Sequence, residues 1–252
     1  MSEVPLAVCE NDENLQAVLN VLRNEAEPVP VRLAALQSLQ AAAFSVISFQ
    51  PCRADYIATL RKIATDPDPE IRQRALGILA RDKDGFAQKK LLEGLQNPDK
   101  ALLPPEKALQ LLSNDVHAEA YAIAREMVKN PPNEIAKQEA LRLLAADAKS
   151  APIFEKHLRD KDETREVREI SAAALQSINP QKMHAEARKI VLDKSDHDDI
   201  QATSLTALAT TSDDTEAAFI DEELFKEVER LRSKGSANVK KSARRFLSKF
   251  GR

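Results

Sequence analysis

Apolar and polar residues alternate along the chain at helical spacing, and the stretch DPDPEIRQRALGILA over residues 66–80 shows the pattern most clearly. Its apolar residues are three or four positions apart, so they share one face of an α-helix. We number this helix from Ile71 as position 1, which makes Ala75 position 5, Leu76 position 6 and Leu79 position 9. Asp68 is expected to cap the helix, and Pro69 suits its first turn because the missing N–H has no partner there.

The same pattern recurs along the whole chain. Position 5 holds a small residue in every copy: Ala35, Ala75, Ala108, Ala140, Ala174, Ser204 and Ala243. These residues are 40, 33, 32, 34, 30 and 39 positions apart, and another helix precedes each copy. All prolines except Pro5 lie in or beside the expected breaks, where they do not interrupt a helix. A period in the thirties with two helices per unit predicts a repeat fold in which each unit packs on its neighbours.

We therefore predict an all-α chain, an α-solenoid of about seven two-helix repeats that form a single array over residues 1–252. The repeats run roughly over residues 11–48, 52–82, 84–113, 117–147, 150–178, 180–210 and 213–250. The last of them is expected to begin with a capping box, Asp213 with Glu216 three residues later.

Composition supports the helical prediction and narrows the setting. The chain is 43% hydrophobic, but only 4% of its residues are aromatic. Because aromatic residues are strand formers, this composition favours helices over strands. It has two cysteines without metal-binding spacing, no basic apolar leader, and no run of about 20 apolar residues that could span a membrane. These features predict a cytoplasmic protein without a membrane span.

Residues 66–79 resemble a HEAT repeat of the kind shared with phycobilisome-lyase-like proteins, through the Asp-Pro turn, Ile71-Arg72 and Ala75-Leu76. The resemblance covers nearly the whole chain as architecture, although position 2 is basic in only four units: Arg32, Arg72, Lys137 and Lys240. It implies a right-handed superhelix whose concave groove is lined by the second helix of each repeat. It implies no single activity, since this architecture serves scaffolds, adaptors and a few enzymes.

The faces of the second helices opposite the apolar stripe are rich in amides. At or near positions 3, 7 and 10 they carry Gln37, Gln73, Gln110, Gln138, Arg142, Gln176, Thr206 and Arg245. Amides donate and accept hydrogen bonds, so a groove of this kind suits an extended peptide backbone. The alternative is a merely solvated surface, because glutamine is also a good helix former.

The C-terminal stretch 234–252 is basic, with seven Lys or Arg residues and no acid, although the whole chain has a net charge of −3. We call its central residues the basic tip: Lys240, Lys241, Arg244, Arg245 and Lys249. This tip could dock nucleic acid, anionic lipid or an acidic protein. Equally, it could be a soluble cap on the terminal repeat, where the basic residues offset the helix dipole.

Three further stretches have alternative interpretations. Phe44, Val46, Ile47 and Phe49 form either an exposed partner-binding patch or a segment covered by the next repeat. The acidic stretch 193–199 could hold a cation weakly, but it lacks the spacing and central glycine of a calcium loop, so a solvated turn is expected. His157 has polar neighbours and is expected at the surface.

The sequence contains no phosphate loop, no nucleophile and base set and no metal-ligand pattern, so we predict no enzyme activity, no cofactor and no metal. Iron-dependent hydroxylases with HEAT repeats use His-Glu dipeptides, and alkylpurine DNA glycosylases of similar size rely on tryptophans; this chain has neither. We predict a non-catalytic adaptor or assembly factor that binds another protein or peptide in the groove. Two alternatives stay open: a bilin-lyase-like or chaperone-like factor acting on a client protein, and, less favoured, nucleic-acid association through the basic tip.

Overall fold

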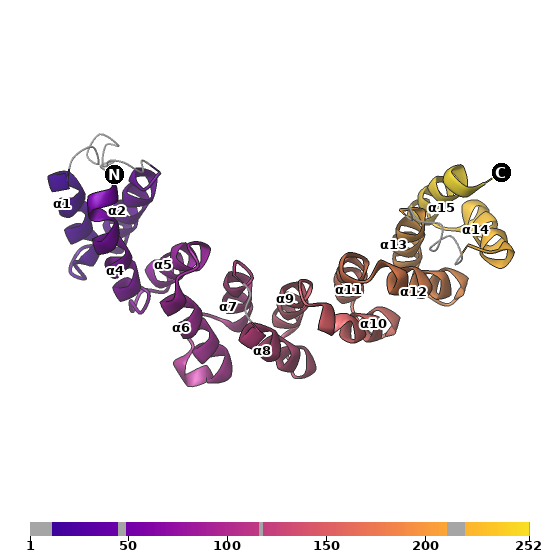
Figure 1. Cartoon of the computed structure of the whole chain (residues 1–252), viewed down its shortest axis with the longest axis horizontal. Coiled ribbons are helices and arrows are strands. Elements are labelled where there is room, and N and C mark those ends of the chain that lie inside the picture. Colours follow the sequence, from indigo (N-terminus) through magenta and orange to yellow (C-terminus); the bar gives the residue numbers. More distant parts are fainter. Residues whose placement is uncertain (1–11, 45–48, 116–117, 211–219, 252) are drawn as a thin grey trace. The chain divides into compact units, whose positions relative to one another are not determined.

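The computed structural model describes residues 12–44, 49–115, 118–210 and 220–251 (Figure 1). The described residues form fourteen α-helices and no strand. The helices are α1 (Asp12–Arg23), α2 (Val29–Ala42), α4 (Arg53–Ile63), α5 (Pro69–Arg81), α6 (Gly85–Gln96), α7 (Pro105–Leu112), α8 (Ala118–Lys129), α9 (Glu134–Leu144), α10 (Ala151–Arg159), α11 (Arg165–Ile178), α12 (Pro180–Leu192), α13 (Asp198–Ala209), α14 (Glu222–Lys234) and α15 (Ala237–Phe250). Three short 3₁₀ turns, η2 (Gln50–Cys52), η3 (Pro98–Lys100) and η4 (Ala148–Ser150), join some of them.

Consecutive helices pack in seven pairs, from α1 with α2 to α14 with α15, and this confirms the predicted two-helix repeats. The second helices also pack on one another: α2 on α5, α5 on α7, α9 on α11, α11 on α13 and α13 on α15. The chain divides into two compact units, residues 1–117 and 118–252, between the third and fourth pairs. The prediction of one continuous array and the handedness of the superhelix stay predictions.

Helix starts follow the expected capping chemistry. The carboxylate of Asp68 accepts hydrogen bonds from the backbone N–H groups of Glu70 and Ile71, both at 3.0 Å, and Pro69 is the first residue of α5. The predicted capping box of Asp213 and Glu216 lies outside the described residues.

Small residues at position 5 and leucines at position 6 pack between the helices, as predicted. Ala75 and Leu76 of α5 have no exposed surface, and Ala140 and Leu141 of α9 are equally enclosed. Position 1 is less regular, since Val31 of α2 is 41% exposed. The small residue therefore marks the packed face more reliably than position 1 does.

The register predicted for α11 is wrong by three residues. Ile170 and Ile178, assigned to positions 1 and 9, are only half-buried, whereas Val167 and Ser171 are fully buried. Position 5 of this repeat is therefore Ser171 instead of Ala174, and the two steps around it become 31 and 33 residues instead of 34 and 30. Four successive small residues, Ser171 to Ala174, allowed either alignment by pattern alone.

The corrected register places Arg168 at position 2, and this position links neighbouring repeats. Arg168 donates from Nε to the carbonyl of Leu158 at 2.9 Å and from its two terminal nitrogens to the Asp196 carboxylate at 2.7 and 2.8 Å. Arg32 of α2 does the same with the carbonyl of Leu22 at 3.1 Å and with Asp66 at 2.5 Å. In each case the acid belongs to the loop between the two helices of the next repeat.

Candidate functional site

Three of the predicted groove residues lie on neighbouring second helices of the first unit, where α2 packs on α5 and α5 on α7. Gln37 of α2, Gln73 of α5 and Gln110 of α7 are all exposed. The side chains of Gln37 and Gln73 make no hydrogen bond to any described residue, and Gln110 accepts one long bond, 3.4 Å, from Lys107. Their amides are therefore available to a partner.

The groove residues predicted in the second unit are less available. Gln138 and Gln176 are half-buried, and Arg142 is exposed but bonds Glu139 at 2.6 Å. Thr206 bonds the carbonyl of Ala202 at 2.9 Å and the Ser242 hydroxyl at 3.2 Å, so it belongs to the contact between α13 and α15. Arg245 is exposed. The open amide row is thus a feature of the first unit.

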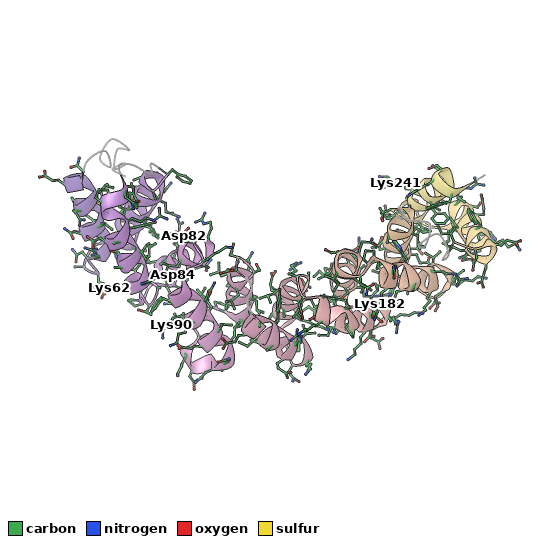
Figure 2. The ribbon with its side chains drawn as sticks, in the orientation of Figure 1. Lys62, Asp82, Asp84, Lys90, Lys182 and Lys241 are labelled. Carbon is green, nitrogen blue, oxygen red and sulfur yellow. The ribbon has the colours of Figure 1, made fainter. Side chains whose placement is uncertain are left out.

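A pocket of about 480 Å³ is lined by residues of α2, α4 and α5 and of the segments that follow α2 and α5. In the first unit α5 packs on both α2 and α4, and Figure 1 labels the three helices. Gln37 belongs both to the amide row and to this pocket. The pocket is lined by Gln37, Gln40, Ala41, Ala43, Phe44, Phe49, Arg53, Tyr56, Ile57, Ile78, Arg81 and Asp82. Asp82, which follows α5 directly, is labelled in Figure 2. The lining combines an apolar wall with exposed charges, as is common in binding sites.

The two phenylalanines of the apolar stretch 41–49 have different surroundings. Phe49 is 2% exposed and packs edge-to-face on Tyr56, with ring centroids 5.3 Å apart. Phe44 is 88% exposed at the pocket. Val46 and Ile47 lie outside the described residues. Phe49 therefore belongs to the core and Phe44 is exposed. The sequence pattern alone does not distinguish these two phenylalanines.

The hydroxyl of Tyr56 is buried without a hydrogen-bond partner among the described residues. Burial raises the pKa of this phenol far above its ordinary value, the charge of Asp82 adds to the rise, and Arg81 opposes it. The phenol is therefore neutral at physiological pH and keeps its proton as a donor. A buried hydroxyl without a partner destabilises a fold by about 1–3 kcal/mol.

The basic tip is only partly free. Lys241, Arg244 and Arg245 are exposed on α15, Lys240 is half-buried, and none of the four forms an ion pair with a described residue (Figure 2 labels Lys241). Lys249 instead donates to the carbonyl of Ala209 at 2.9 Å and lies 5.0 Å above the ring of Phe250. Lys249 therefore anchors α15 to the preceding repeat.

The acidic stretch 193–199 is largely exposed, as the sequence predicts, but some of its acids are held in ion pairs. Asp196 is enclosed with Arg168, and Asp199 pairs with Arg165 at 2.7 Å. These acids are satisfied by cations from the preceding repeat, which the local sequence does not show. No group of three or more His, Cys, Asp or Glu residues that could hold a metal occurs in the described part of the chain.

His157 is buried, at 7% exposure, and its Nδ1 lies 2.7 Å from the Glu163 carboxylate, so the surface prediction is wrong. Lys137 bonds the same carboxylate at 2.5 Å. Burial alone would raise the pKa of Glu163, but the hydrogen bonds from Lys137 and His157 outweigh it and lower the pKa. This cluster joins α9 and α10 to the loop before α11, where polar neighbours in sequence gave no sign of burial.

Among the described helices, none is both long enough and apolar enough to span a bilayer. Comparison with protein-family models found no matching family, and comparison with characterised proteins found no relative.

Several solved structures are similar to the chain. An engineered protein shares 18% identity with a TM-score of 0.52, over 97% of this chain and 72% of its own. Two more distant structures each have a TM-score of 0.39. Human deoxyhypusine hydroxylase in complex with glycerol is 12% identical, over 94% of this chain and 96% of its own. A designed armadillo repeat protein in complex with the peptide (KR)4 is 17% identical, over 94% of this chain and 99% of its own. The paired helices, their period and the first similarity together show that the chain has a HEAT-like helical repeat fold.

Proposed function

We propose that the chain is a non-catalytic binding module that holds an extended peptide segment of another protein across the second helices of its first unit. The observation that carries the proposal is the pair Gln37 and Gln73, exposed on adjacent helices with their amides unbonded. An extended peptide presents alternating N–H and C=O groups, and a primary amide can bond both. We propose that the module acts in the cytoplasm as an adaptor or assembly factor. It would then connect the protein that carries this peptide to other proteins bound on its remaining surfaces.

Two carboxylates with shifted pKa values have structural partners. Burial alone would raise the pKa of Asp84, but bonds from Arg61 and from the first N–H groups of α6 lower it. The pKa of Glu186 is lowered in the same way, because bonds from Arg159 and Lys189 outweigh burial. Asp84 thus serves an ion pair and the cap of α6, and Glu186 serves ion pairs, so contacts within the fold explain both shifts.

Selection of peptides from a random display library on the full chain tests the proposal, with affinities then measured by fluorescence anisotropy. The triple variant Gln37→Ala, Gln73→Ala, Gln110→Ala should bind the selected peptides at least about tenfold more weakly, since each hydrogen bond contributes roughly 0.5–1.5 kcal/mol. The control is Gln96→Ala, Gln181→Ala, two exposed glutamines on the first helices α6 and α12. Failure to select any peptide, or equal affinity of the triple variant and the control, contradicts the proposal.

Nucleic-acid association is a second candidate, favoured by the absence of ion pairs at Lys241, Arg244 and Arg245 within the described part of the chain. Binding of a labelled DNA duplex should then weaken steeply between low and physiological salt. If a variant with these three residues and Lys240 changed to Ala binds equally well, the candidate fails. The alternative of a bilin-lyase-like or chaperone-like factor has no residue-level support; pigment bound to the chain after co-expression with a client chromoprotein would identify it.

A further inference from the structure

We propose that the pocket between α2, α4 and α5 is the anchor site of this module, and that it takes a bulky apolar side chain of the peptide together with an adjacent carboxylate. The inference rests on the proposed peptide-binding function and specifies which residues the peptide carries. The pocket joins the amide row at Gln37, so a peptide lying along the row reaches it without leaving the surface.

Size and wall chemistry define the apolar part of the anchor. A volume of about 480 Å³ is in the range of sites that enclose a ligand, and it has room for a bulky side chain and part of its neighbour. Phe49 and Ile78 form buried parts of the wall, and Ile57 is half-buried. Phe44, 88% exposed, is the apolar surface that an incoming side chain would cover. Binding energy in protein interfaces concentrates in such aromatic-lined pockets.

The charges at the pocket define the polar part. Two other arginines of α4 and α5, Arg61 and Arg74, are paired with carboxylates at 2.7 and 2.8 Å, and Arg72 donates to backbone carbonyls at 2.6 and 2.7 Å. Arg53 and Arg81, in contrast, are exposed at the pocket and form no ion pair with a described residue, and neither does Asp82. Two unpaired cations against one anion leave an excess positive charge, which a carboxylate of the peptide complements.

Tyr56 also lines the pocket, but its hydroxyl is enclosed and does not contribute to the pocket surface. It is buried, it has no partner among the described residues, and it keeps its proton at physiological pH. The apolar wall and the unpaired arginines therefore select the same kind of occupant, an apolar residue beside an Asp or Glu.

The peptides selected from the random library are the probe. They should share an aromatic or long aliphatic residue next to an acid, and replacing that acid by its amide should weaken binding about tenfold. Phe44→Ser and the pair Arg53→Glu, Arg81→Glu should weaken it at least tenfold, and neither should disturb the fold because all three side chains are exposed. Lys62→Glu is the matched control: it is an exposed cation of α4 without an ion pair, outside the pocket (Figure 2).

A second readout reports from inside the pocket. The chain has two tyrosines and no tryptophan, so Tyr121→Phe leaves Tyr56 as the only strong emitter. Binding of a selected peptide that itself lacks Tyr and Trp should change the Tyr56 emission. Unchanged emission on saturation with the peptide would place the bound peptide elsewhere.

The outcomes separate this inference from the proposed function. Weakening by the pocket variants, with Lys62→Glu unchanged, supports the inference. If the selected peptides lose affinity for the glutamine triple variant but bind the Phe44→Ser and Arg53→Glu, Arg81→Glu variants like the parent chain, the function stands and the anchor site is refuted. If no peptide can be selected, both fail together.

Discussion

Replacement of Arg168 by methionine removes the cation of a buried ion pair that links the fifth and sixth repeats. The side chain of Arg168 is 0% exposed and that of Asp196 3% exposed. The guanidinium satisfies the carbonyl of Leu158 at 2.9 Å and both oxygens of Asp196 at 2.7 and 2.8 Å. Methionine fills similar space but donates nothing, so an acid and a carbonyl are left buried without these bonds.

The expected loss follows from this burial. Removing one partner of a buried ion pair typically costs about 3–5 kcal/mol, because the other charge stays enclosed without compensation. The double variant Arg168→Met, Asp196→Leu should recover much of the loss, since apolar replacement of a whole buried pair is often close to neutral. Arg232 of α14 provides the exposed comparison, in an ion pair with side chains 49% and 48% exposed. Arg232→Met should cost less than about 1 kcal/mol.

Urea unfolding of the full chain, followed by circular dichroism at 222 nm, measures these losses. Hydrogen exchange with mass spectrometry then assigns them, and Arg168→Met should reduce protection in α11 and α13 before other helices. If Arg168→Met costs no more than Arg232→Met, or if the double variant is as unstable as the sum of its single changes, the assignment of position 2 as the link between repeats is refuted.

Other residues give independent predictions. Tyr56→Phe should raise the free energy of unfolding by about 1 kcal/mol, measured as a higher melting temperature, because it removes a buried hydroxyl without a partner; an unchanged or lower value contradicts this. Because the pKa of Tyr56 is raised, its full contribution to the free energy of unfolding is present below pH 10 and is lost as the pH rises further. Tyr56→Phe should reduce this decline. The pKa of Glu186 is lowered, since bonds from its arginine and lysine partners outweigh burial, so its contribution is present above pH 4.5 and lost as the pH falls; Glu186→Gln should flatten the acid side of the urea-midpoint profile. Gly94→Ala should destabilise the chain by roughly 1 kcal/mol or more, because a Cβ there would lie 2.9 Å from the backbone before α7, whereas Gly85→Ala, which meets nothing within 4 Å, should stabilise it by about 0.4–1 kcal/mol; equal urea midpoints would contradict the packing argument.

The exposed part of the candidate site followed from helical periodicity, and the pocket did not. Gln37 and Gln73 are exposed as predicted, because residues opposite an apolar stripe face away from the core. Thr206 has the same kind of position but bonds Ser242 of the next second helix. Periodicity within one helix gives the direction of a side chain but not the identity of the element that approaches it.

The pocket shows this limit most clearly. Phe44 and Phe49 belong to one apolar stretch, yet one is 88% and the other 2% exposed. Their difference depends on Tyr56 of α4, whose ring packs edge-to-face on Phe49 and whose hydroxyl is left without a partner. Since the pocket requires three helices to meet, no local pattern could predict it.

The sequence by itself determined the helices, their pairing into repeats and most of their buried faces, because capping residues, proline positions and a repeated small residue act locally or at a constant spacing. The tertiary structure alone decided the register of α11, where the fully buried Val167 and Ser171 occupy positions 1 and 5 and Ile170 is only half-buried. It also decided which ionisable groups pair between repeats. The register of α11 and the ion pairs between repeats both depend on burial and charge pairing between segments about 30 residues apart. Neither segment alone contains the information for such a contact.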